Sequence, residues 1–122
     1  MRALLGLAAL LLAPPIGYPT GPSARLPDFF ARLSDAAIAL TEQRVTYDPS
    51  YFVIAYPNGD VPADRGVCTD VVIRAYRALG IDLQKEVHED MKAHFSLYPR
   101  RWGLSRTDAN IDHRRVPNLM TF

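Results

Sequence analysis

The only cysteine of this 122-residue chain, Cys68, lies at the start of a segment whose residue pattern predicts a helix. Backbone N–H groups in the first turn of a helix have no partner within the helix, and they stabilise a thiolate placed beside them. Cys68 is therefore a candidate nucleophile near neutral pH. The alternative is a small buried side chain in a core, a common role for a free cysteine. The residue type alone leaves both interpretations open.

The predicted helix that would carry Cys68 covers residues 66–81. Gly80 suits the left-handed residue that often follows a helix, and Asp64 is a candidate cap at its start. The band of apolar side chains is wide, which predicts that most of the helix circumference is buried. The stripe at four-residue steps consists of Val67, Val71, Ala75 and Leu79.

The N-terminus predicts a signal peptide. A short basic start, Met1-Arg2, precedes an unbroken apolar run from Ala3 to Ala13, which is shorter than the roughly 20 residues needed to cross a membrane. We expect cleavage near Ala24, so that 1–24 is the signal peptide and 25–122 is an exported domain of the periplasm or cell envelope. We therefore expect no membrane span after cleavage. One cysteine cannot form a disulfide within the chain, even in an oxidising compartment.

Charge and composition exclude some partners. The formal net charge is +1 at pH 7, so the chain lacks the basic surface that nucleic-acid binding requires. No residue pattern indicates a cofactor or a metal site. The length after cleavage suits one small domain, and the sequence leaves the oligomeric state open.

The remaining segments predict a mixed fold. Helices are expected over 28–44 and 83–97, the second capped by Asp82, and another helix begins at 116–122. Segments 45–47 and 51–56 are rich in β-branched and aromatic residues, so they predict two short strands. Residues 100–115 are polar and predict irregular structure. The apolar stripe of the second helix consists of Leu83, Val87, Met91 and Phe95.

Three histidines could serve Cys68 as a general base. His88 and His94 lie on the predicted helix 83–97, where exposed or structural roles are the simpler interpretation. His113 lies in the run Asp112-His113-Arg114-Arg115 and is the best candidate of the three. Its alternative role is to fix a loop through hydrogen bonds.

Several side chains with oxygen donors surround the predicted helix start. Asn58, Asp60 and Asp64 lie in one loop, but their spacing does not fit a calcium-binding hand, and turn or cap chemistry explains them more simply. Asp60 and Asp64 are nevertheless candidates to contact a substrate bound at Cys68. Asp70 is a third candidate, and it could instead accept a hydrogen bond from the segment 100–115.

Several motifs together carry a family resemblance. The segment Gly66-Val67-Cys68-Thr69-Asp70 is similar to the nucleophile helix of NlpC-type, papain-like cysteine peptidases. With Ala55-Tyr56-Pro57-Asn58-Gly59-Asp60 and Asn110-Ile111-Asp112-His113, it resembles domain-of-unknown-function family 1287 (DUF1287), a group of bacterial exported proteins. The match extends from about Ser34 onward.

The resemblance implies a fold and an activity. The expected fold is α+β, a papain-like (NlpC-like) half-domain of helices with two short strands and without the C-terminal sheet. The implied function is an exported cysteine hydrolase of envelope amide bonds, with peptidoglycan stem peptides as the substrate class and Cys68 as the nucleophile. In that superfold a histidine follows on a downstream strand, so residues 25–122 are expected to be the N-terminal part of a longer domain, inactive by themselves. The alternative is a non-enzymatic envelope-binding protein with a buried Cys68.

Overall fold

The computed structural model describes residues 26–122, and the predicted signal peptide lies outside them. Within this range, two short strands, β1 (Thr46–Tyr47) and β2 (Arg65–Gly66), form a parallel sheet. Helices and a small sheet together make the α+β class, as predicted. The α-helices are α1 (Leu26–Ala39), α2 (Cys68–Ala78), α3 (Leu83–Ala93) and α4 (Val116–Thr121), and the 3₁₀ turns are Leu40–Glu42, Phe95–Leu97, Arg101–Gly103 and Asp112–Arg114.

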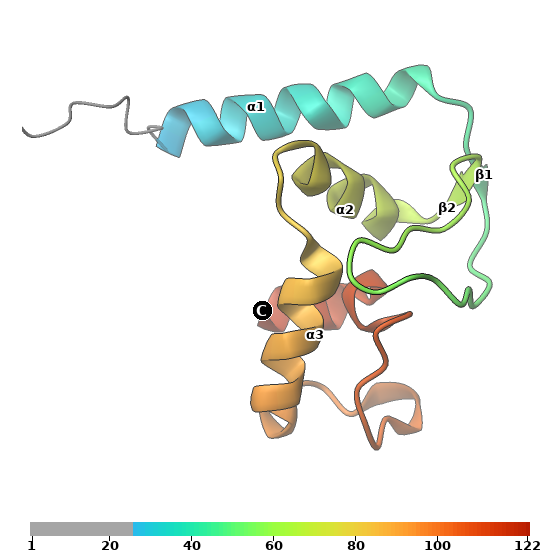
Figure 1. Cartoon of the computed structure of the whole chain (residues 1–122), viewed down its shortest axis with the longest axis vertical. Helices are drawn as coiled ribbons and strands as arrows, with labels where there is room; N and C mark the ends of the chain where they lie inside the picture. The colour runs from blue at the N-terminus through green and yellow to red at the C-terminus, as the bar shows by residue number, and fades with distance from the viewer. Residues whose placement is uncertain (1–25) are drawn as a thin grey trace, which may run out of the picture.

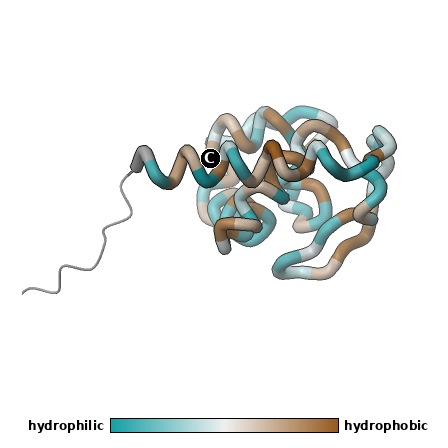
Figure 2. Tube along the Cα trace, turned by 90° about the horizontal axis from the view of Figure 1, so that it is seen from above, coloured by the Kyte–Doolittle hydropathy of each residue, from teal (hydrophilic) through white to brown (hydrophobic). Residues whose placement is uncertain are grey.

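The first helix lies across one side of α2 (Figure 1). Figure 2 shows that hydrophilic and hydrophobic residues alternate along α1. Because a single helix covers this side, Val71 and Val72 of α2 remain 46% and 43% exposed. The prediction that α2 is buried around most of its circumference is therefore wrong. The buried residues of α2 are Thr69, Asp70, Ile73 and Ala75.

The helix boundaries follow capping chemistry. The cap of α2 is Val67, whose backbone N–H donates to Asp70 Oδ2 at 2.7 Å, so the prediction of Asp64 as the cap is wrong. Asp70, the third residue of the helix, thus supplies the half of a capping box in which a side chain accepts from the N–H of the cap residue. After α2, Gly80 adopts a φ of 84°, and Asp82 caps α3 by accepting from the Gln84 N–H, both as predicted.

The small sheet pairs different segments from those expected. Thr46 of β1 lies opposite Arg65 of β2, and Tyr47 lies opposite Gly66, in parallel register. The prediction of a second strand at 51–56 is wrong. This segment forms no ladder, and side chains from distant parts of the chain bind its backbone instead; the Asn110 Oδ1, for example, accepts from the Ile54 N–H at 3.0 Å.

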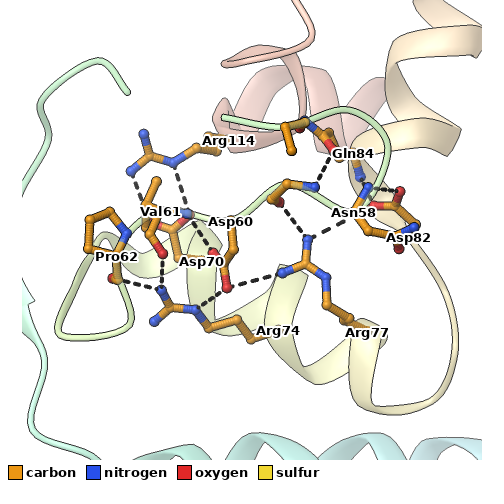
Figure 3. Close-up of polar contacts among 12 residues, drawn as sticks. Asn58, Asp60, Val61, Pro62, Asp70, Arg74, Arg77, Asp82, Gln84 and Arg114 are labelled. Atoms are coloured by element: carbon orange, nitrogen blue, oxygen red, sulfur yellow. Dashed lines mark hydrogen bonds and ion pairs between the residues drawn. The ribbon is translucent and has the colours of Figure 1, made fainter. Parts of the chain in front are cut away.

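One buried side chain fixes the loop between the strands. Gln84 of α3 is fully buried, and its Oε1 accepts from the Gly59 N–H at 2.8 Å (Figure 3). Its Nε2 donates to the carbonyls of Ala55 at 2.8 Å and Ala109 at 3.1 Å. A single amide therefore binds three backbone groups from two segments, which brings the loop and the C-terminal part of the chain together against α3.

The apolar core is small and lies on the inner face of α3. Val87, Met91 and Tyr98 are buried, and Phe95, Leu104 and Leu119 pack around them. The predicted stripe of this helix is confirmed at Leu83, Val87 and Met91. A core of this size is supplemented by buried polar residues of the C-terminal segment. These are Asp112, His113, Arg114 and Asn118.

Gly59 is the position where the loop tolerates a side chain least. A Cβ added there would lie 1.9 Å from the Ala55 carbonyl oxygen. We expect Gly59→Ala to lower the free energy of unfolding by about 1–3 kcal/mol, as overpacking does. Gly80→Ala is the control, since it meets only the cost of a left-handed φ in open space, about 1 kcal/mol. Urea unfolding followed by circular dichroism measures both, and an equal loss would contradict the loop argument.

Candidate functional site

Cys68 is the first residue of α2 and lies at the surface. Beside it is a hollow of about 210 Å³, lined mainly by apolar side chains. The structure therefore does not place Cys68 in the core, and the thiol is accessible from outside. The lining residues are Tyr47, Pro49, Val67, Cys68, Thr69, Ile111, Arg114 and Val116.

The start of α2 is joined to the C-terminal segment by a buried ion pair (Figure 3). Arg114 Nε donates to Asp70 Oδ1 at 2.9 Å, and its Nη2 donates to Oδ2 at 3.0 Å. The two side chains are only 2% and 3% exposed. The Thr69 hydroxyl also donates to the Arg114 carbonyl at 2.9 Å. The predicted hydrogen bond from segment 100–115 to Asp70 is confirmed, and Asp70 is occupied by Arg114.

The other two acidic candidates do not line the hollow. Asp60 accepts from Arg74 Nε at 3.0 Å and lies 3.1 Å from Arg77 Nη1, so two cations of α2 occupy its carboxylate (Figure 3). Asp64 is exposed, and its backbone carbonyl accepts from the Thr46 N–H at 2.8 Å. Both residues hold the loop before α2 in place, and neither is brought to Cys68.

His113 is buried in the 3₁₀ turn before α4, with 1% of its surface exposed. It does not line the Cys68 hollow. Burial lowers the pKa of its imidazole to about 4, so it is neutral at pH 7. Its Nδ1 has no hydrogen-bond partner among the described residues. The structure therefore places this candidate base inside the fold.

The other two histidines pair with carboxylates away from Cys68. His88 Nδ1 lies 3.0 Å from Asp112 Oδ2 and links α3 to the C-terminal segment. Burial raises the pKa of Asp112. His94, which follows the last residue of α3, has its Nδ1 3.0 Å from Oδ1 of Asp90 in that helix. Both histidines have structural contacts, as the simpler interpretation predicts.

The described residues hold neither a cluster of metal ligands nor a membrane-spanning helix. Among residues 26–122 no group of three His, Cys, Asp or Glu side chains is arranged to hold a metal ion. Over the same range, every helix is too short or too polar to cross a membrane.

Sequence reasoning missed the two residues that organise this region, Arg114 and Gln84. Arg114 belongs to the segment 100–115 that is expected to reach Asp70, but nothing in the local sequence distinguishes it from the other arginines there. Gln84 gave no signal, because a glutamine in the first turn of a helix is ordinarily exposed. Both become recognisable only when the segments they join are placed in space.

Comparison with known proteins decides the family. The model of the domain of unknown function DUF1287 matches residues 34–122. The chain belongs to this family. It is also 56% identical over 90 residues to the Uncharacterized protein YijF of Escherichia coli (strain K12), a match that covers 74% of this chain and 44% of the relative. The chain thus spans less than half the length of this curated relative. No solved structure matches the chain.

Removing one partner of the buried Asp70–Arg114 ion pair should cost more stability than removing a partner of an exposed pair. Arg114→Ala would leave a carboxylate buried and unpaired, so we expect the free energy of unfolding to fall by about 3–5 kcal/mol. The control is Arg65→Ala, which removes an ion pair to Asp48 whose arginine is 52% exposed and should cost about 0–1 kcal/mol. Denaturant unfolding compares the two variants, and similar losses would contradict the assigned role.

His113 should make the fold sensitive to acid. Its pKa is about 4 in the folded chain and 6.5 ordinarily, so between these values the unfolded chain binds a proton that the folded chain does not. Acidification therefore favours unfolding, by about 3 kcal/mol between pH 6.5 and 4.

The measurement is the free energy of unfolding at several pH values across that range. His113→Gln should lose less stability on acidification than the unmodified chain does. His94→Gln is the control, because His94 is 56% exposed, and it should keep the original pH dependence. An unchanged slope in His113→Gln would show that His113 is not the group responsible.

Proposed function

We propose that this chain carries the nucleophile of an exported thiol hydrolase that cleaves amide bonds of the bacterial envelope, with peptidoglycan stem peptides as the substrate class. The observation that supports this most is the exposed Cys68 at the first position of α2, beside a hollow large enough for a small acyl group. The similarity of residues 66–70 to NlpC-type, papain-like peptidases supports the reaction type. The signal-peptide pattern of residues 1–24 supports the periplasm or cell envelope as the location.

In the proposed reaction, the Cys68 sulfur attacks the carbonyl carbon of the amide while the thiol proton passes to a base. The C–N bond then breaks, the base returns the proton to the departing amine, and a thioester remains on Cys68. Water hydrolyses the thioester, which releases the acid and restores the thiol. The unpaired backbone N–H groups of the first turn of α2 would stabilise the oxyanion.

The base in this proposal comes from another part of a full-length family member. Among residues 26–122, no imidazole or carboxylate lines the hollow beside Cys68. His113 is buried and acts within the fold, and Asp70 is neutralised by Arg114. Residues 25–122 would then be one part of a larger catalytic domain.

The second candidate function is non-enzymatic binding in the envelope. The exposed apolar residues Trp102 and Met120 favour it, since surface patches of this kind mark interaction sites. The sequence-based version of this alternative, in which Cys68 is a buried structural thiol, does not fit the exposed position of this residue.

Thiol reactivity separates these functions. We expect iodoacetamide at about pH 6 to alkylate Cys68 in the folded chain at a rate no lower than in denaturant, because the thiol is exposed at the first position of α2. Intact-mass spectrometry measures both rates, and Cys68→Ser verifies the site of modification. A native rate far below the rate in denaturant would show that the fold covers the thiol, and it would contradict the role of Cys68 as a nucleophile.

Activity is best tested in a chimera in which residues 34–122 of this chain replace the matched segment of the E. coli relative. We expect the chimera to release peptide fragments from isolated peptidoglycan, because the remaining part of the relative supplies the base. The released fragments are identified by liquid chromatography and mass spectrometry. Cys68→Ser should abolish the release, and a chimera whose release survives this substitution would rule out Cys68 as the nucleophile.

A further inference from the structure

A second surface feature lies on the outer side of the last helix. Trp102, Val116 and Met120 are 61%, 47% and 82% exposed. They border a hollow of about 700 Å³, whose apolar lining we name the α4 face. It consists of Pro99, Trp102, Val116, Pro117 and Met120. Gathered apolar side chains at the surface mark an interaction site, whereas single ones do not.

Trp102 is held at this face at an energetic cost. Its φ is 58°, in the left-handed region that bulky residues rarely adopt. The Arg115 guanidinium lies over the indole at 4.7 Å from the ring centroid and fixes the ring from one side. Residues held in sparsely populated backbone regions cluster at functional sites, so the conformation of Trp102 favours a function for this face.

The α4 face is continuous with the Cys68 hollow. Val116 lines both, because it begins α4 directly after the Asp112–Arg114 turn. A polypeptide that covered the α4 face would therefore border the hollow beside Cys68.

We propose that the α4 face docks the polypeptide that forms the rest of a full-length family member, the part of the E. coli relative outside the matched residues. The match covers 44% of that relative, so more than half of its residues lie elsewhere in the same protein. The face offers what an interdomain contact needs, an apolar centre with the guanidinium of Arg115 and the side chain of Arg101 at its edge. This docking does not depend on the thiol chemistry proposed above.

Methionine oxidation tests the docking within one molecule. Cys68→Ser is introduced into this chain and into the chimera, so that no thiol reacts and the result is separate from catalysis. Hydrogen peroxide should oxidise Met120 in the chimera about tenfold more slowly than in the chain alone, since oxidation follows exposure. Met91 is the internal control, because it is fully buried and should stay protected in both. Equal rates at Met120, with Met91 protected, would overturn the proposal.

Rapid oxidation of Met91 in the chimera would mean that the chimera is not folded. In that case a second assay tests docking at the α4 face. The tagged chain is then co-expressed with the remaining polypeptide of the relative, and co-purification is measured. Met120→Glu should abolish it. Ile38→Glu is the matched control, because Ile38 is 62% exposed on α1, away from the α4 face. Absence of co-purification, or co-purification that survives Met120→Glu, would overturn the proposal.

The α4 face could instead bind a second copy of this chain. Sedimentation velocity of the chain alone tests this alternative. We expect a monomer. A dimer that Met120→Glu dissociates would assign the face to self-association and overturn the proposal.

Discussion

The structure depends on one buried ion pair, between Asp70 and Arg114. Removing two charges from water is costly, and the cost is offset here because the guanidinium meets the carboxylate with two parallel hydrogen bonds. The same carboxylate accepts from the Val67 N–H and so caps α2. One interaction therefore fixes where α2 begins, where the C-terminal segment lies and how Cys68 is presented. Losing either partner would disturb all three.

Side chains, more than strands, hold the rest of this small fold together. The sheet has only two short strands, and the long loop between them is bound by Gln84 and by the arginines of α2. Arg74 donates to the carbonyls of Val61, Pro62 and Arg65, which ties the end of the loop to the helix that follows it. Satisfying backbone carbonyls in this way replaces a β-ladder, because every buried carbonyl needs a donor from some source.

The two surface features meet where α4 begins. The Cys68 hollow has a candidate nucleophile but, among the described residues, no base, and the adjacent α4 face has exposed apolar residues but no cover. A single additional polypeptide could supply both, which is why the docking proposal and the hydrolase proposal concern one region. Membership of DUF1287 fits this arrangement, because the family relative is more than twice as long as the segment it shares with this chain.

Local sequence determined where the main helices lie, two of the residues at their ends and the family. Gly80 and Asp82 act through their own backbone and side-chain chemistry, and the four-residue spacing of Val87 and Met91 reports one buried helix face. Only the tertiary structure decided which segments pair, that the 51–56 segment is not a strand, and that Arg114 lies in the interior. These outcomes depend on contacts between residues far apart in the chain, such as the 44 positions that separate Asp70 from Arg114, and local periodicity carries no information about such contacts.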